Sequence, residues 1–234
     1  MQRRVVVVSA GLLAAGLVGC SSSAQPHRPV PAGESPLLSG APRTSTVFTS
    51  EISPLPGLVF TWPTPGWHAT DAIAQVIVHP PNLPRASLYV SKGLFPVAAT
   101  GAFLTTRISA RSVIAALRHV PALRASQPVQ ERIGDGLAVS RVDLRLSPSA
   151  PRSAFTYLSY RGSSVNPAVF TIEPGMSVRV YAAVFSAPYG HELLNIAVEA
   201  PTGRVFARWT SLAARVLKTL RLPKGTVPGR AIFN

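Results

Sequence analysis

The chain of 234 residues is 47% hydrophobic and 14% charged and contains 23 prolines and 17 glycines, which indicates a globular domain joined to a less ordered segment. Its single cysteine excludes an intramolecular disulfide and every metal site that needs a pair of cysteines. Lys and Arg number 23 against 9 Asp and Glu, yet the arginines are scattered singly without a helix-turn-helix, RNP or zinc-finger pattern, so we expect no nucleic-acid partner.

Residues 1–19 have the organisation of a bacterial signal peptide. Arg3 and Arg4 provide a positive start, and an uncharged apolar run covers residues 5–19. As a helix this run would be roughly 22 Å long, which is shorter than the ~30 Å hydrocarbon core of a bilayer. The run therefore predicts a cleaved signal and not a membrane span.

The end of that run, Leu17-Val18-Gly19-Cys20, resembles the lipobox of bacterial lipoproteins. The resemblance implies that the Cys20 thiolate accepts a diacylglyceryl group, that the bond between Gly19 and Cys20 is then cleaved, and that the new N-terminus receives a further acyl chain such as palmitate. Two or more acyl chains give the stable anchoring that one chain does not. We expect a protein held by lipid on the outer face of the cytoplasmic membrane; the alternative is an ordinary secretory signal that happens to contain a cysteine.

Residues 20–57 are predicted to form a disordered tether. Ser, Pro, Ala and Thr dominate, no apolar periodicity is present, and seven prolines exclude a helix and disfavour strand pairing. Fully extended at about 3.1 Å per residue, this tether would reach on the order of 100 Å. It could hold a domain clear of a membrane surface.

We expect a globular domain over residues 58–223 and a C-terminal tail over residues 224–234. Its first part, residues 58–67, combines a β-prone run with a Pro-Thr-Pro-Gly turn. Two strands are predicted next, at 75–79 and 86–91.

A helix is predicted over residues 110–120. Ser109 can cap it, apolar residues recur at helical spacing along it, and Pro121 ends it.

The middle of the chain predicts antiparallel strands. Gly134-Asp135-Gly136 is a strong hairpin signal between strands at 130–133 and 137–146. Near Ser140 the apolar positions change parity, which predicts either a β-bulge or a change of the buried face. Alternating patterns predict three further strands, at 154–161, 177–185 and 194–198.

The last predicted element is a helix over residues 205–220, with one broad apolar stripe and its basic residues off that stripe. We expect this stripe to pack on the sheet, because two strands directly precede the helix. A helix lying on a membrane surface would have the same basic polar face, so that alternative stays open.

The order of strands, helix, strands and helix predicts an α+β layered domain. The opening "FTWPTPGW", with Phe60, Pro63 and Trp67, the mid-chain helix and the closing "VRVYAAVF…LLNIAVEAP…VLKTLRLP" resemble the actinobacterial LpqN-type lipoproteins over residues 58–222. The resemblance implies a Mog1/PsbP-like fold, in which an antiparallel sheet is packed between helices as an αβα sandwich. It also implies a binding or accessory role in the envelope, and it brings no catalytic residues.

No motif for catalysis, a cofactor or a metal is present. There is no G-x-S-x-G, S-x-x-K, P-loop or G-x-G-x-x-G, and no pair of histidines has metal-ligand spacing. A Ser-His-Asp triad is recognised by geometry, so the sequence leaves one open if a histidine meets a serine or carboxylate within hydrogen-bond reach. The candidate histidines are His68, His79 and His191.

Five large side chains could line a binding groove, because aromatic and arginine side chains dominate binding hot spots. The alternative is that the aromatic rings pack beneath the helices. These side chains are Trp62, Trp67, Arg179, Tyr181 and Phe185.

Together these observations favour a non-enzymatic, lipid-anchored envelope protein that binds a protein partner or an apolar lipid ligand. The alternative is a hydrolase or transferase that acts on the envelope. The excess positive charge has two open explanations: the general composition of many basic bacterial proteins, or attachment to anionic lipid or polymer, which predicts binding that weakens steeply with salt.

Overall fold

A computed structural model of the chain describes residues 47–51, 55–72, 75–150, 152–161, 169–188 and 190–228. The expected signal peptide, with Gly19 and Cys20, and the tether up to residue 46 lie outside these ranges. Every described helix and strand belongs to one compact unit, residues 36–234. The hydrophobic residues that form its interior also come from this unit alone.

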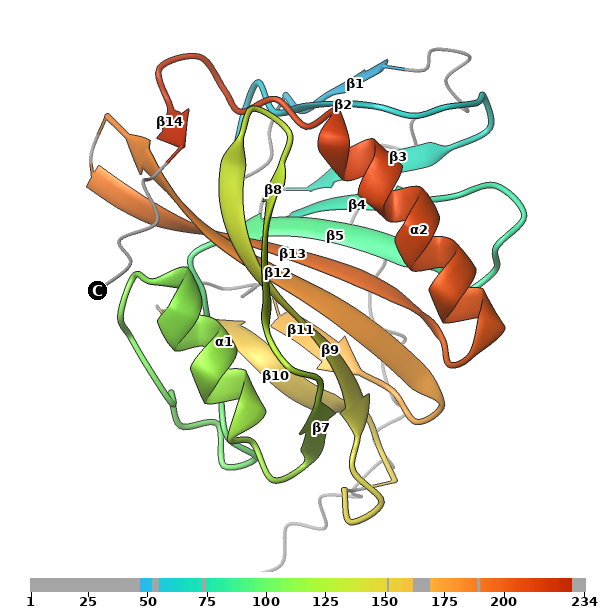
Figure 1. Cartoon of the computed structure of the whole chain (residues 1–234), viewed down its shortest axis with the longest axis vertical. Helices are drawn as coiled ribbons and strands as arrows, with labels where there is room; N and C mark the ends of the chain where they lie inside the picture. Colours follow the sequence, from blue (N-terminus) through green and yellow to red (C-terminus); the bar gives the residue numbers. More distant parts are fainter. Residues whose placement is uncertain are drawn as a thin grey trace, which may run out of the picture. The chain divides into compact units, whose positions relative to one another are not determined.

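The described chain is a mixed α+β fold of antiparallel strands and two helices, as the order of predicted elements indicates (Figure 1). The main sheet runs in the order β3 (His68–Ala72), β4 (Gln75–His79), β5 (Ser87–Lys92), β13 (Gly190–Pro201), β12 (Met176–Ala187), β9 (Leu137–Leu146) and β7 (Leu123–Ala125), with β8 (Val129–Ile133) on β9 and β14 (Val227–Pro228) on β12. A second sheet has the order β11 (Val169–Ile172), β10 (Phe155–Tyr160) and β6 (Leu94–Pro96), and β1 (Val47–Thr49) pairs with β2 (Val59–Thr61). The helices are α1 (Ala110–Arg118) and α2 (Arg204–Lys218).

The central strands of the main sheet are buried on both faces and separate two hydrophobic cores. The α2 core lies between one face of the sheet, α2 and the β1–β2 pair; the α1 core lies between the other face, α1 and the second sheet. On β12, Val180 and Ala182 belong to the α1 core, whereas Tyr181 and Ala183 belong to the α2 core. The same central strands therefore bound both cores, one on each face of the sheet.

Strand β9 explains the change of parity near Ser140. Its seven pairs with β12 run without a register shift, so the strand contains no bulge there. Leu137 and Val139 lie in the α2 core, whereas Val142 and Leu144 lie in the α1 core. A change of the buried face in a regular strand is the alternative that the structure confirms.

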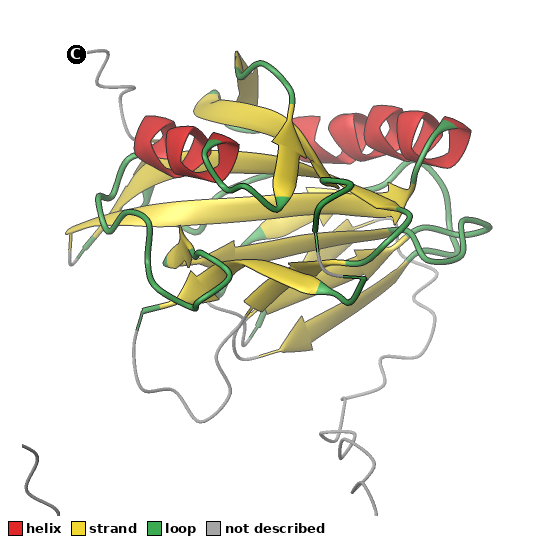
Figure 2. Ribbon diagram, turned by 90° about the horizontal axis from the view of Figure 1, so that it is seen from below, coloured by secondary structure: helices red, strands yellow, loops and turns green. Residues whose placement is uncertain are grey.

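The two helices lie on either side of the β8–β9 hairpin (Figure 1). Figure 2 shows both helices towards the top of the view, with most of the strands layered below them. The predicted cap of α1 is present, because the Ser109 Oγ accepts a hydrogen bond from the Ser112 amide at 3.3 Å. The apolar stripe of α2 packs on β13 and buries Phe206 and Trp209, as expected for a helix on a sheet.

The folded region extends past both predicted domain boundaries. β1 pairs with β2 and buries Phe48, so folded structure begins before Leu58, where the domain was expected to start. β14 lies within the predicted tail of residues 224–234 and pairs with β12. Strands of two or three residues are too short to show a period-2 pattern, which is why the sequence did not predict them.

The end of α2 docks on the turn of the β8–β9 hairpin. The Gly134 amide donates to the Leu217 carbonyl oxygen at 2.9 Å. The Asp135 carboxylate accepts from Arg221 Nη1 at 2.7 Å and from the Leu222 amide at 3.1 Å. The turn predicted from Gly134-Asp135-Gly136 therefore also fixes the position of the second helix.

Replacing Gly134 by alanine should therefore disrupt this docking. Gly134 has a φ of +45°, and an added Cβ would collide with the backbone carbonyl of Leu220. We expect Gly134→Ala to lower the free energy of unfolding by about 3 kcal/mol or more, measured by urea denaturation with tryptophan fluorescence. Gly136→Ala is the matched control in the same turn, since its φ of +79° is strained but the nearest atom, on Arg132, is 4.0 Å away. Equal losses in the two variants would contradict the docking explanation.

Candidate functional site

The predicted sites of cleavage and lipidation, Gly19 and Cys20, lie outside the described residues, and both stay predictions. Within the described ranges, two features have the chemistry of a site. One is a polar network on β4, β5 and β13, and the other is an exposed apolar segment between β6 and α1.

Two of the three candidate histidines lie beside a serine. His79 Nδ1 is 3.0 Å from Ser87 Oγ, and His191 Nδ1 is 3.0 Å from Ser186 Oγ. His68 lies opposite His79 in the β3–β4 ladder. In the described part of the chain no carboxylate is hydrogen bonded to either imidazole, so neither pair there has the third member of a catalytic triad.

The His79 and Ser87 pair continues into a longer polar network. Ser87 lies opposite Glu199 in the β5–β13 ladder. Tyr89 lies two residues after Ser87 on β5, and Ser87 and Glu199 both influence the pKa of its hydroxyl. The neighbouring polar side chains are His79, Ser87, Tyr89 and Glu199.

Glu199 changes its charge near neutral pH. Burial raises the pKa of Glu199 to about 7, and the Glu173 carboxylate raises it as well, while Arg85 and the nearby Tyr89 hydroxyl oppose the rise. Glu173 is itself paired with Arg85 at 3.1 Å. Burial also raises the pKa of the neighbouring phenols, that of Tyr89 and more strongly that of Tyr157.

These side chains place titratable groups close together on one face of the sheet, with a hydrogen bond between His79 and Ser87. They do not present a nucleophile, because Ser87 is only 6% exposed and its hydroxyl is hydrogen bonded to His79. Tyr89 and Glu199 were not predicted from the sequence because they lie far apart along the chain and belong to no motif.

The five predicted groove residues do not form an open groove. Four are at most 2% exposed, and three tryptophan rings contact in series in the α2 core, the first pair stacked and the second tilted, with centroid separations of 5.8 and 5.7 Å. The aromatic packing alternative is therefore confirmed. The four buried residues are Trp62, Trp67, Tyr181 and Phe185.

The fifth, Arg179, forms a bidentate ion pair with Asp143. Its Nε and Nη2 donate to the two carboxylate oxygens at 2.7 and 2.9 Å. Its guanidinium carbon also lies 6.0 Å from the centroid of the Phe206 ring. Hydrogen bonding to Asp143 raises the pKa of Arg179, so this side chain stays positively charged. Its contacts with Asp143 and Phe206 link β12 to β9 and α2.

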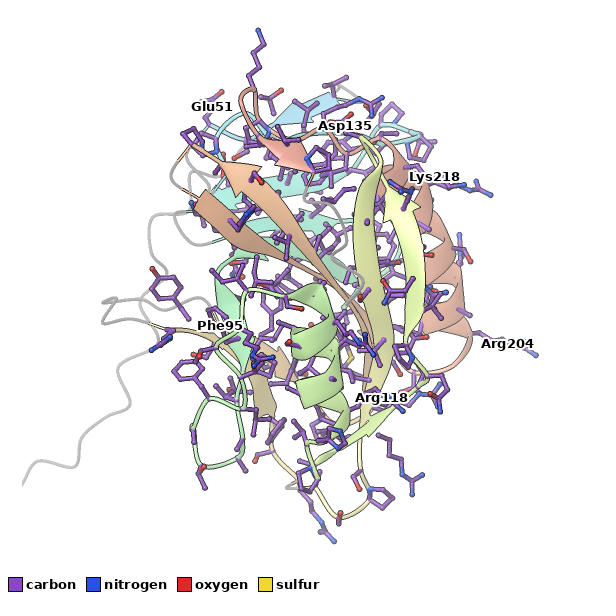
Figure 3. The ribbon with its side chains drawn as sticks, turned by 60° about the vertical axis from the view of Figure 1, so that its left-hand side comes forward. Glu51, Phe95, Arg118, Asp135, Arg204 and Lys218 are labelled. Atoms are coloured by element: carbon purple, nitrogen blue, oxygen red, sulfur yellow. The ribbon has the colours of Figure 1, made fainter. Side chains whose placement is uncertain are left out.

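The exposed apolar segment comprises residues 101–111. Of the seven large hydrophobic residues that are exposed in the described ranges, three lie here: Phe103 at 38%, Leu104 at 43% and Ile108 at 50%. The Phe103 ring packs edge-on against Phe95 at 6.5 Å. Figure 3 shows Phe95 on one side of α1, and Arg118, the last residue of this helix, at its end.

No group of three or more His, Cys, Asp or Glu among the described residues is arranged to hold a metal ion. Among the described helices, neither is long and apolar enough to cross a membrane.

No protein-family model matches the chain, and no curated protein does. Among solved structures, the chain is similar to a protein from Bacteroides thetaiotaomicron VPI-5482, determined at 1.50 Å. The two share 14% sequence identity with a TM-score of 0.40, over 78% of this chain and 50% of that one. The chain thus spans about half the length of that protein, and the similarity is too weak to support an argument about function.

The raised pKa of Glu199 predicts a pH-dependent stability. The protonated carboxyl is favoured in the fold, so this contribution is present below about pH 4.5 and is lost as the pH rises through 7. Glu199→Gln stays neutral, so we expect it to be more stable than the unmodified chain at about pH 8, by on the order of 1 kcal/mol after solvent screening. The gain should shrink towards about pH 5.

Urea denaturation across this pH range measures the effect. Glu192→Gln, on the same strand but in an ion pair with Lys92, is the control and should show no gain at the alkaline end. A stability difference between Glu199→Gln and the unmodified chain that does not vary with pH would contradict the assignment.

Proposed function

We propose that the chain is a lipoprotein of the cell envelope, anchored by lipid on Cys20, whose domain is a non-enzymatic binding or accessory module on the outer face of the cytoplasmic membrane. One observation carries the proposal. Leu17-Val18-Gly19-Cys20 places the only cysteine where an apolar run gives way to a Ser-rich tract, which is where lipidation requires it. Kinship with the LpqN-type lipoproteins and their Mog1/PsbP-like fold is part of the same proposal.

One feature of the described domain supports binding. Three large apolar side chains of residues 101–111 are exposed, and exposed apolar surface of this kind marks protein or membrane contact. The groove predicted from the sequence does not contribute, because Arg179 is held in a structural ion pair and the candidate aromatic residues are buried in the α2 core.

A hydrolase or transferase is the second candidate, and the contact between His79 and Ser87 favours it. A fluorophosphonate probe tests this candidate, because it reacts with an activated serine. Labelling of Ser87 that is lost in His79→Ala would support an enzyme and contradict the binding module. We expect no labelling, since Ser87 is buried.

Mass spectrometry of the protein from its native host tests the anchor. We expect an N-terminus at Cys20 that carries a diacylglyceryl group and an N-acyl chain, and partition of the protein into detergent. Cys20→Ala should yield unprocessed or released protein, because no thiolate is left to accept the lipid. The same unmodified mature mass in both proteins would contradict lipidation.

A further inference from the structure

We propose that the segment of residues 101–111, which runs from the connection after β6 into the first turn of α1, docks the folded domain on the surface of an anionic lipid bilayer. This contact goes beyond the Cys20 anchor, because the domain makes it with its own side chains and without lipid modification.

The apolar part of the segment is held in place by the backbone. Val97 and Phe103 form an antiparallel bridge, and the Leu104 amide donates to the Pro96 carbonyl oxygen at 2.9 Å. Gly101, with a φ of +80°, closes this turn. Phe103 and Leu104 are therefore presented to solvent from an ordered hairpin at the edge of β6, where burial in the boundary region of a bilayer would remove them from water.

Along the sequence, the charged side chains within and beside the segment have one sign. No Asp or Glu occurs anywhere from residue 93 to residue 130, whereas four arginines do, and all four are exposed. Guanidinium groups pair with phosphate in a bidentate geometry, and basic residues beside inserted apolar side chains are typical of segments that bind anionic membranes. The arginines are Arg107, Arg111, Arg118 and Arg124.

Helix α2 has the other basic surface, but it has no apolar side chains to insert. Its stripe is buried in the α2 core, which removes the sequence-based alternative of a membrane-surface helix over residues 205–220. Figure 3 shows Arg204 and Lys218 on the α2 side of the molecule, away from Phe95. Charge and exposed apolar surface therefore coincide at residues 101–111 and not at α2.

Cosedimentation with vesicles tests the docking. The probe protein is the compact unit of residues 36–234, which contains both cores and lacks Cys20. Vesicles of phosphatidylglycerol and phosphatidylcholine in equal parts are compared with phosphatidylcholine alone. We expect binding to the anionic vesicles, and a loss of roughly tenfold or more in affinity for the pair Arg107→Glu and Arg111→Glu.

The pair Arg204→Glu and Arg208→Glu on α2 is the matched control. It makes the same change in net charge, again near the start of a helix, where glutamate is compatible with the helix dipole. We expect it to change the affinity by no more than about twofold, because screening confines attraction to charges near the membrane.

A second pair of variants tests the apolar contribution. Leu104→Ser with Ile108→Ser should weaken vesicle binding several-fold, because less apolar surface leaves water. Val129→Ser with Val227→Ser removes two other exposed apolar side chains and should have little effect. Circular dichroism of each variant confirms that it is folded.

Three results would overturn the docking proposal. Equal losses in the two arginine pairs would show diffuse electrostatic attraction. If the protein did not bind vesicles but needed this segment to bind an envelope protein, the segment would be a protein interface. Absence of vesicle binding while the native protein carries lipid at Cys20 would remove the docking and leave the anchor intact, so the two proposals fail separately.

Discussion

Burial of β12 and β13 on both faces is the constraint on which the rest of the structure depends. A strand that is apolar on both faces needs a cover on each, and here α2 with the β1–β2 pair covers one face while α1 with the second sheet covers the other. Strand β9 contributes to both cores, because the face that it buries changes along its length. The helices then lie on either side of the β8–β9 hairpin, and the turn of that hairpin anchors the end of α2.

The candidate sites follow from how the α1 core is closed. β13 places Glu199 on the face of the sheet that Tyr89 also occupies, and burial there raises the pKa of Glu199 to about 7. The connection from β6 to α1 must leave the core and return to it, and residues 101–108 do so at the surface. Apolar side chains on such a connection stay in contact with water, which is unfavourable, unless a partner covers them. The segment is therefore a candidate for docking.

The sequence predicted the long elements well, because 137–146, 177–185 and the two helices have regular apolar spacing or clear caps and turns. It missed β1, β6, β7 and β14, whose two or three residues carry no period, and also β3 and β11, whose five and four residues show no clear alternation. For the sites, Cys20 was predicted from a local motif, whereas the Glu199 network depends on pairing between β5 and β13, which no spacing reveals. The exposure of Phe103 and Ile108 was missed because apolar residues in a connection usually pack inward, and only the folded chain shows otherwise.

Amide hydrogen exchange of the mature, membrane-bound protein tests the membrane contact most directly. The protein is placed in vesicles with and without phosphatidylglycerol, so that only the lipid charge changes. Docking through the β6–α1 connection predicts slower exchange of the amides of residues 102–108 in the anionic vesicles, with the amides of α2 unchanged. Equal exchange in both vesicles, or protection of α2 instead, would contradict it.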